Sequence, residues 1–319
     1  MNQNEEKIYN LIEQNDVITI WGHELPDGDC YGCQIGLREL IRKTFPHKKV
    51  YAIGSGIPSL YARIATMDNV DLRTIKRSLA ILVDASCLRR IEDQRVVHAN
   101  QFAKFDHHMI NPGEEFSDVA FVDSDRVSCA EIIAEFAFDH RMAFTKTAAE
   151  ALYVGIITDS GRFRFFGTGP KTFEDVAALF KYGIEPKSIF DLLFAEDPAT
   201  AKFKAFLLKR AAFDGQVAYV FLNPEDYLHQ GLTYERASSM VNSLMGLGYP
   251  IYCLFTVDDR GDVRGELRSK RGYRVQPTAA KFGGGGHLYA AGLCLRQQKP
   301  SFHKVIAELN KVEYQPEEN

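Results

Sequence analysis

Short apolar runs alternate with amphipathic stretches along the first half of the chain. The apolar runs have the length of strands, and the stretches between them repeat their apolar residues near the helical period, as in Ile35, Leu37, Leu40 and Ile41. Strands are predicted at 17–22, 49–53, 79–84, 102–106 and 119–122. This alternation is typical of βαβ units, so the predicted fold class is α/β, with a parallel sheet that carries helices on both faces.

Helical patterns dominate from about residue 130 to residue 208, and a second unit begins at the apolar run 216–221. Further strands are predicted at 250–257, 262–268 and 290–296, with helical runs at 238–245 and at the C-terminus. This mixture indicates a smaller α+β domain. The predicted organisation is a first domain (1–190), a linker and connecting helix (191–213) and a second domain (214–319), with a functional cleft between the domains.

Composition narrows the class of protein. With 319 residues, 45% of them hydrophobic, the chain can bury a large core. No stretch reaches the roughly 20 apolar residues of a membrane span, and the first residues lack the pattern of a signal peptide, so we expect a cytoplasmic protein. The formal charge of -4 argues against a large basic surface for long nucleic acids. The six cysteines are scattered, which predicts reduced thiols.

Metal-binding residue types follow the apolar runs at several points. They are His23, Asp27 and Asp29 after the first run, and Asp84, Asp106, His107, His108 and Asp159 after later ones. The last of these follows the apolar segment 154–158, which we interpret as another such run. Because the carboxyl ends of parallel strands share one edge of a sheet, these side chains should converge. Each alone is more often a helix cap or a surface residue, but together they predict a metal site.

The types of ligand indicate which metal the site would hold. Aspartate oxygens with a minority of imidazoles suit manganese, magnesium or another borderline divalent ion better than a thiolate-bound zinc ion. So many ligands would crowd a single ion, whereas two ions about 3.5–4 Å apart that share a bridging aspartate would use them all. Such a pair would polarise a phosphoryl group and activate water. The sequence therefore favours a two-metal site for phosphoryl chemistry.

Six short motifs, spread from about Ile18 to Leu295, form a specific set. In the first half they are His23-x-x-Pro26-Asp27-Gly28-Asp29, Asp84-x-Ser86, Asp106-His107-His108 and Asp159-Ser160-Gly161-Arg162-Phe163. In the second half they are Arg264-Gly265-Glu266-Leu267-Arg268-Ser269 and Gly283-Gly284-Gly285-Gly286-His287-x-x-Ala290-Ala291-Gly292. The set resembles the DHH phosphoesterase superfamily with its DHH-associated domain. The compact two-domain layout is most similar to the bacterial nanoRNase and 3′-phosphoadenosine-5′-phosphate phosphatase group.

The resemblance implies a role for each matching position. His23, Asp27 and Asp84 would hold one manganese ion, and Asp29, Asp84, His107 and Asp159 would hold the other, with Asp84 bridging. Mg²⁺ or Co²⁺ could substitute for Mn²⁺. His108 would face the substrate phosphate, so His108 and Asp84 are the expected catalytic residues. Asp106 would orient a ligating imidazole through its other ring nitrogen.

The chain departs from the family pattern beside these ligands. Where the family often has Ala-x-Gly-Ser, this chain has Cys30-Tyr31-Gly32-Cys33. The Cys-x-x-Cys spacing is not accompanied by a second pair at zinc-finger spacing in this segment, so we interpret both thiols as small packing residues at the start of a helix. How this run shapes the pocket wall is left open.

Glycine and arginine residues of the second domain indicate a phosphate site. The run Gly283–Gly286 is richer in glycine than a turn needs, which suggests close backbone approach to a ligand. Arg264 and Arg268 fall on one face of a predicted strand and could both contact phosphate. The residues expected to bind substrate are Arg264, Arg268, Ser269, Gly284, Gly285, Gly286 and His287, with Arg162 from the first domain. Arg162 is equally compatible with a structural salt bridge.

The resemblance implies hydrolysis of short oligoribonucleotides to 5′-mononucleotides, of 3′-phosphoadenosine-5′-phosphate to AMP, or of both. Cyclic or linear di-adenylate cleavage would use the same centre. An inorganic pyrophosphatase should lack the two motifs of the second domain, and a non-catalytic nucleotide-binding protein should have lost a ligand, whereas none is missing. The expected partners are short RNA or small nucleotides, with neither a membrane nor long nucleic acid, and a homodimer is left open.

Overall fold

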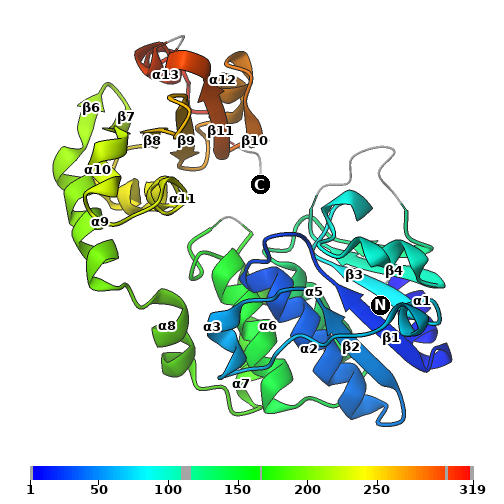
Figure 1. Ribbon diagram of the computed structural model, residues 1–319. Coiled ribbons are helices and arrows are strands. Elements are labelled where there is room, and N and C mark those ends of the chain that lie inside the picture. Colours follow the sequence, from blue (N-terminus) through cyan, green and yellow to red (C-terminus); the bar gives the residue numbers. More distant parts are fainter. Residues whose placement is uncertain (1–2, 109–115, 166, 299–300, 317–319) are drawn as a thin grey trace. The chain divides into compact units, whose positions relative to one another are not determined.

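The computed structural model describes residues 3–108, 116–165, 167–298 and 301–316 and divides the chain into two compact units, Met1–Ala195 and Glu196–Asn319 (Figure 1). No helix among the described residues is long and apolar enough to cross a membrane.

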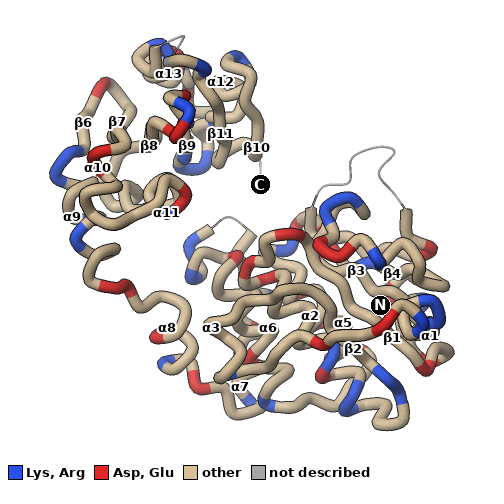
Figure 2. Tube along the Cα trace, viewed as in Figure 1, with Lys and Arg blue, Asp and Glu red and all other residues tan. Residues whose placement is uncertain are grey.

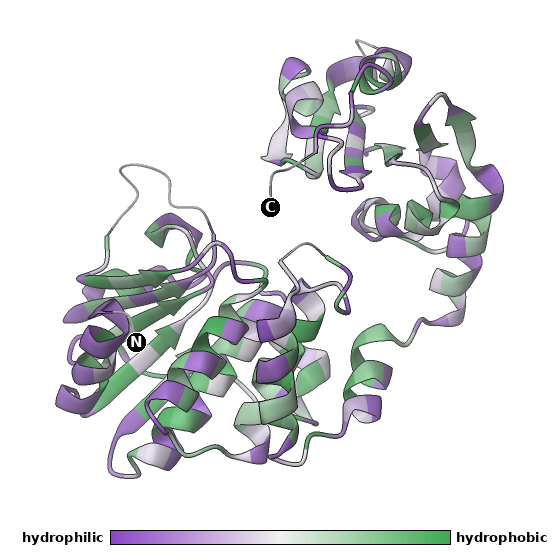
Figure 3. Ribbon diagram, turned by 180° about the vertical axis from the view of Figure 1, so that it is seen from behind, coloured by the Kyte–Doolittle hydropathy of each residue, from purple (hydrophilic) through white to green (hydrophobic). Residues whose placement is uncertain are grey.

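The first unit is built on a sheet of five parallel strands in the order β2-β1-β3-β4-β5. The strands are β1 (Val17–Trp21), β2 (Lys49–Ile53), β3 (Leu79–Val83), β4 (Gln101–Asp106) and β5 (Val119–Val122). All five residues of β3 are buried, as expected for a central parallel strand that is covered on both faces. Figure 3 shows the hydrophobic colour of these strands. The predicted α/β class is confirmed.

Helices cover the two faces of this sheet in different ways. One face carries α2 (Gly28–Thr44) and α5 (Cys129–Asp139), and α6 (Lys146–Asp159) and α7 (Pro170–Phe180) pack against these two helices. The core on this side includes Ile20, Ile81 and Phe105. The opposite face carries α4 (Leu72–Ile75) and the 3-10 turns η1 (Leu88–Arg90) and η2 (Gln94–His98). Its core includes Trp21 and Leu82. The remaining helices of the unit are α1 (Gln3–Gln14), which contacts β5, the short α3 (Pro58–Tyr61) and α8 (Pro186–Phe194).

Glycines let α2 and α6 approach each other closely. Gly28, Gly32 and Gly36 recur at four-residue spacing along α2, so they share one side of the helix. A Cβ atom at Gly32 would lie 2.4 Å from the backbone oxygen of Ala151, and one at Gly28 would lie 2.3 Å from Oγ1 of Thr158. Both distances are too short for real atoms, so glycine is required where the two helices touch.

The second unit is built on a six-stranded mixed sheet in the order β10-β11-β9-β8-β7-β6. The strands are β6 (Ala212–Asp214), β7 (Val217–Leu222), β8 (Ile251–Val257), β9 (Val263–Ser269), β10 (Gly285–His287) and β11 (Ala290–Leu295), and only β7 and β8 pair in parallel. Helix α9 (Pro198–Arg210) precedes them. The predicted helical pattern through Phe213 therefore ends three residues early, because Phe213 pairs with Ala218 of β7 in the sheet.

Helices cover both faces of the second sheet as well. One face packs against α12 (Gln276–Lys281) and α13 (Phe302–Leu309), around Phe255 and Leu267. The other packs against α9, α10 (Pro224–Leu228), α11 (Tyr234–Ser238) and the 3-10 segment η3 (Ser239–Leu247), around Phe203, Tyr227 and Leu254. The helical run predicted at 238–245 is the junction of α11 and η3.

The contact between α2 and α6 predicts that replacing a helical glycine by alanine lowers the stability of the protein. Alanine normally stabilises a helix relative to glycine by about 0.5–1 kcal/mol. We expect Gly32→Ala to destabilise the protein instead, by about 1–3 kcal/mol, because the added methyl group meets the Ala151 carbonyl. Urea denaturation of both proteins measures the difference. Gly246→Ala is the matched control, because no atom lies within 4 Å of its added Cβ; a more stable Gly32→Ala protein would contradict the packing argument.

Candidate metal centre and active site

The candidate site lies where the strands of the first unit end. His23 follows β1, Asp84 follows β3 and His107 follows β4, and these three strands are neighbours in the sheet. Asp29 stands in the first turn of α2, and Asp159 is the last residue of α6. Figure 2 shows acidic positions at this edge of the unit. The predicted convergence of these side chains is therefore seen in the structure.

One group of donors consists of His23, Asp27 and Asp84. Nε2 of His23 lies 3.8 Å from Oδ1 of Asp27 and 3.4 Å from Oδ2 of Asp84. The other ring nitrogen of His23 lies 2.8 Å from the backbone oxygen of Glu24, which orients the ring. Asp27 also caps α2, because its Oδ1 accepts hydrogen bonds from the backbone of Asp29 and Cys30. These three side chains are close enough to hold a metal ion.

A second group consists of Asp29, His107 and Asp159, with Asp84 again at its edge. Nε2 of His107 lies 3.4 Å from Oδ2 of Asp159, 3.9 Å from Oδ2 of Asp29 and 3.4 Å from Oδ1 of Asp84. Asp84 thus turns one carboxylate oxygen toward each group. This is the arrangement that a bridging carboxylate requires.

Two features of Asp84 fit a metal ligand. Its Oδ1 atom is buried and accepts no hydrogen bond from the residues that the structure describes, although burying an unsatisfied acceptor is costly. Its backbone has a φ of 54°, in the left-handed region that residues other than glycine rarely adopt. Strain of this kind persists where the surrounding structure imposes it, often at functional sites. The donor set and the unpartnered oxygen therefore fit a divalent metal ion.

Asp29 is held from the opposite side by the start of α5. Its Oδ2 accepts from the backbone N–H of Cys129 at 2.7 Å and its Oδ1 from that of Ala130 at 2.9 Å. The thiol of Cys33 also donates to Oδ1, at 3.5 Å. Asp29 is completely buried, and burial together with the nearby charge of Asp84 raises the pKa of its carboxyl group. The backbone of α5 thus fixes this carboxylate where its charge is costly.

The metal-free cluster retains protons. Burial opposes a charge on His107, but the carboxylates of Asp84, Asp29 and Asp159 outweigh it and raise the imidazole pKa to about 10. Burial is also the main cause that raises the pKa of Asp159 to about 7. Protons therefore reduce the repulsion among these carboxylates, and a divalent cation would serve the same purpose.

Asp159 reaches the site from the end of a helix. Residues 154–158 form the end of α6, in agreement with the helices predicted over 130–208 and not with the strand-like run that their apolar sequence suggests. The strand-like interpretation is wrong because residues 148–157 of α6 are buried all round, so the helix lacks the polar face that marks helical periodicity. Asp159 still meets the other ligands, because α6 packs along α2.

Asp106 orients a different imidazole from the one expected. Its Oδ1 lies 2.8 Å from Nδ1 of His108 and accepts from the His108 backbone at 3.1 Å. Nδ1 of His107 instead lies 3.3 Å from the backbone oxygen of Arg126. Burial works against the charge on Asp106, but His108 and Lys104 outweigh it and hold its pKa below the usual range. The sequence analysis did not identify Lys104. Its position two residues before Asp106 on a predicted strand was a usable signal, because it places both side chains on one face of the sheet.

The residues around the centre take structural roles as well. Cys30 and Cys33 are fully buried in α2, in keeping with their interpretation as packing residues. Arg162 lies with its guanidinium 4.7 Å from the centre of the Phe194 ring, so its partner there is an aromatic face and not the acidic group of a salt bridge.

The arginines of the second unit lie on β9. Arg264 and Arg268 are half-buried on one face of the strand, as their alternation predicted, and Glu266 lies between them. Nε of Arg264 donates to Asp258 at 3.1 Å, and Arg268 lies 3.4 Å from Glu266. The hydroxyl of Ser269 donates to the backbone oxygen of Tyr273. These groups therefore have protein partners that a ligand would have to share or replace.

The glycine run 283–286 was expected to let a ligand approach the backbone, but two of its glycines are explained by packing within the protein. A Cβ at Gly284 would lie 2.1 Å from the backbone oxygen of Gly292, and one at Gly286 would lie 2.6 Å from that of Ala290. These two glycines are required by the neighbouring strand β11. Nothing lies within 4 Å of a Cβ at Gly283 or Gly285, so only these two positions leave space for a ligand.

A pocket of about 1070 Å³ lies beside this run in the second unit. Arg260, Arg264 and Arg296 line it, together with Phe282 and Gly283. Arg260 and Arg296 were not among the predicted binding residues: Arg260 lies in the turn between β8 and β9, and Arg296 begins the 3-10 turn η4 (Arg296–Gln298) that follows β11. Asp262 also lines the pocket, so three arginines stand beside one carboxylate and an aromatic ring; arginine and aromatic side chains are groups that bind nucleotide phosphates and bases.

Comparison with known proteins places these features in a family. Residues 17–156 match the DHH family, N-terminal domain, and residues 214–312 match the DHHA1 domain. The chain is 32% identical over 308 residues to a Bacillus subtilis protein named bifunctional oligoribonuclease and PAP phosphatase NrnA, covering 95% of this chain and 96% of that protein. A Mycoplasma genitalium protein of the same name is 32% identical over 312 residues, covering 96% of each.

A solved structure agrees with the fold. The crystal structure of an exopolyphosphatase-related protein from Bacteroides fragilis matches with a TM-score of 0.83 and 20% sequence identity, covering 97% of this chain and 95% of that chain. At this identity the likeness concerns the fold alone. The two family matches and the relatives that cover nearly the whole chain confirm the resemblance seen in the motifs: the chain belongs to the DHH family.

Proposed function

We propose that this phosphoesterase uses manganese to hydrolyse short oligoribonucleotides to 5′-mononucleotides and 3′-phosphoadenosine-5′-phosphate to AMP. The observation that carries the proposal is the Asp84 carboxylate, which turns one oxygen toward His23 and the other toward His107 and leaves Oδ1 without a hydrogen bond. The names of the full-length relatives support the same pair of substrates.

The candidate site residues of the first unit have the following roles in this proposal. His23, Asp27 and Asp84 hold one Mn²⁺, and Asp29, Asp84, His107 and Asp159 hold the other. When bound, the two ions polarise the phosphoryl oxygens and lower the pKa of water. His108 contacts the substrate phosphate through the ring nitrogen that faces away from Asp106. The N–H groups at the start of α5 hold the carboxylate of Asp29, so this ligand would be positioned before a metal binds.

The second unit would hold the rest of the substrate. Arg264, Arg268 and His287 supply positive or hydrogen-bonding groups, and Gly283 and Gly285 leave space for a phosphate near the backbone. The pocket that Arg260 and Arg296 line would extend this binding surface toward a base or sugar. Because the chain carries a net charge of -4, we expect it to bind only a few phosphates at a time.

Asp84→Asn tests the metal assignment. The amide keeps the size of the side chain and tolerates the left-handed backbone, but it lacks the charge to bridge two cations. We expect the turnover number with 3′-phosphoadenosine-5′-phosphate and saturating Mn²⁺ to fall at least about 100-fold, since metal ions contribute several kcal/mol to such reactions. Asp175→Asn is the control, because Asp175 is equally buried in the same unit but pairs with Lys171. Turnover near that of the wild type in Asp84→Asn would refute the bridging role.

Metal binding should release protons. The neighbouring carboxylates raise the pKa of His107, and burial raises that of Asp159, so both groups bind protons more readily than they would in water. Both must lose their protons to bind Mn²⁺, so apparent affinity should rise with pH and activity lost in acid should partly return with excess metal. Calorimetric titration in buffers of different ionisation enthalpy counts the protons released. Binding without proton release, or an acid limb that excess Mn²⁺ leaves unchanged, would contradict this assignment.

Substrate length tests the proposed activity. We expect dinucleotides to roughly five-mers to be hydrolysed faster than 30-mers, with a salt dependence that corresponds to about two or three phosphates. Rate constants against RNA length at two salt concentrations measure both. Cyclic di-adenylate, linear di-adenylate and pyrophosphate are run in parallel as competing substrates. Faster turnover of 30-mers than of trimers, or preference for one of the three competitors, would replace the proposed substrates.

A further inference from the structure

A buried lysine lies behind the candidate site. Lys104 is on β4, two residues before Asp106, so the two side chains project from the same face of the sheet. Lys104 is only 4% exposed, which is rare for a lysine. Its Nζ donates to Oδ2 of Asp106 at 3.1 Å and to the backbone oxygen of Ser86 at 3.2 Å. Dehydrating an ammonium group is expensive, so these two contacts must largely offset that cost.

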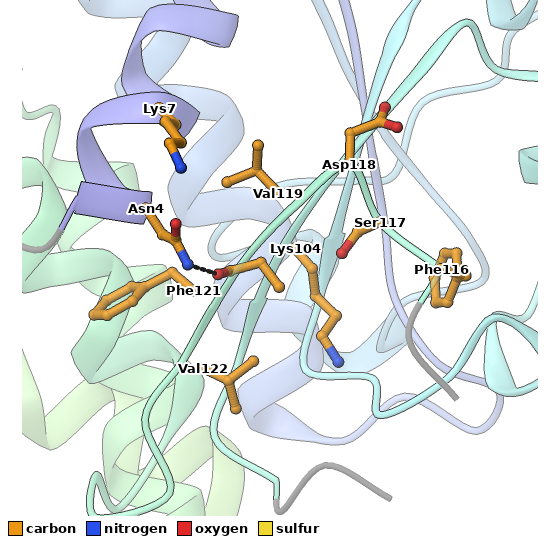
Figure 4. Close-up of a pocket in the computed structure, with 10 residues that line it drawn as sticks. Asn4, Lys7, Lys104, Phe116, Ser117, Asp118, Val119, Phe121 and Val122 are labelled. Atoms are coloured by element: carbon orange, nitrogen blue, oxygen red, sulfur yellow. Dashed lines mark hydrogen bonds between the residues drawn. The ribbon is translucent and has the colours of Figure 1, made fainter. Parts of the chain in front are cut away.

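The side chain of Lys104 also borders a pocket. The pocket has a volume of about 420 Å³ and is also lined by Asn4, Lys7 and residues 116–122 (Figure 4). Asp118, another carboxylate in this pocket, accepts a hydrogen bond from the backbone of Phe102. A flexible lysine could extend into such a space and stay hydrated. The contacts of the Lys104 ammonium group with Asp106 and Ser86 determine where its charge lies.

Asp106 connects this lysine to His108. Its two carboxylate oxygens have different partners: Oδ2 accepts from Lys104, and Oδ1 accepts from the backbone of His108 and lies 2.8 Å from Nδ1 of its ring. The second contact of Lys104, at Ser86, lies two residues beyond Asp84. One ammonium group therefore ties the loop after β3 to the last residue of β4.

We propose that Lys104 is a positioning residue for the hydrolytic reaction. By holding Oδ2 of Asp106, Lys104 fixes the rotation of the carboxylate. The carboxylate in turn fixes the ring of His108 through Nδ1, and Nε2 is left to face the substrate phosphate. Lys104 itself touches neither the substrate nor the metal ligands. The inference rests on the proposed function, because it takes His108 as a residue that contacts the phosphate.

Lys104→Met keeps the length of the side chain and removes the charged donor. We expect turnover of 3′-phosphoadenosine-5′-phosphate to fall about 10- to 100-fold, as for other groups that orient a histidine in metal sites. The KM and the calorimetric affinity for Mn²⁺ should stay within about twofold of wild type. Lys48→Met is the matched control: Lys48 is 7% exposed in the same unit and donates to the backbone oxygens of Glu13 and Asn15, away from the site. Its removal should leave turnover unchanged.

A double-mutant cycle separates positioning from general support of the fold. If Lys104 acts through Asp106, then Lys104→Met added to Asp106→Asn should lower turnover less than about threefold further. The full effect of Lys104→Met in that background, or wild-type turnover in Lys104→Met alone, would overturn the proposal. If thermal melting shows that Lys104→Met is unfolded, Lys104→Gln, which keeps an uncharged donor, takes its place.

One readout does not need activity. Long-range ¹H–¹⁵N NMR of the metal-free protein should show shifted ring signals of His108 in Lys104→Met and unshifted ones in Lys48→Met. Unshifted His108 signals in Lys104→Met would refute positioning even if turnover changed. A wild-type enzyme that hydrolyses neither short RNA nor 3′-phosphoadenosine-5′-phosphate would refute the proposed function instead, while the NMR comparison would still decide whether Lys104 positions His108.

Discussion

Direct backbone contact between α2 and α6 is the constraint on which the site depends. Gly28 and Gly32 remove the side chains that would separate the helices, and Gly155 does the same from α6, where a Cβ would lie 2.7 Å from Oδ1 of Asp29. Each glycine in a helix costs about 0.5–1 kcal/mol relative to alanine. In return, the close packing of the helices places Asp29 of α2 and Asp159 of α6 beside the same histidine, His107. The sheet supplies three strand ends, but the two helices bring in the remaining carboxylates.

The site concentrates charge that the fold alone would not favour. Asp29 and Asp84 are almost completely buried near Asp159, and the pKa values of Asp29 and Asp159 are raised mainly by burial. Asp84 adds an unsatisfied oxygen and a left-handed backbone. Such strain lowers stability and persists because the surrounding elements are rigid, here the core of the sheet and the first turn of α5. The energetic penalty lies at the positions where a cation would relieve it.

Much of the fold followed from residue patterns, because central parallel strands are continuous apolar runs that end sharply at polar residues. Asp84 and His107 could be identified by residue type at such ends. Asp159 lies beside the other candidate ligands at the end of α6, within the predicted helical region 130–208, but its own apolar run suggested a strand because a helix that is buried all round has no polar face to reveal its period. The partner of Asp106 depends on side-chain rotation, which sequence does not encode locally. The spacing of Gly28, Gly32 and Gly36 was a usable signal for close helix packing, and it was overlooked.

The carboxylate partners of the basic residues in the second unit also could not be predicted from the sequence, because they too depend on side-chain rotation. The sequence suggests a strongly cationic strand, yet Arg264 is paired with Asp258 and Arg268 lies beside Glu266. An anion that binds there must compete with these carboxylates, and the pair with Asp258 is the harder one to displace because Asp258 is buried. A terminal phosphate carries more charge in one place than a bridging phosphodiester does. If these arginines bind substrate as proposed, their carboxylate partners favour a ligand with dense local charge, such as a terminal phosphate, over one with the same charge spread along a strand.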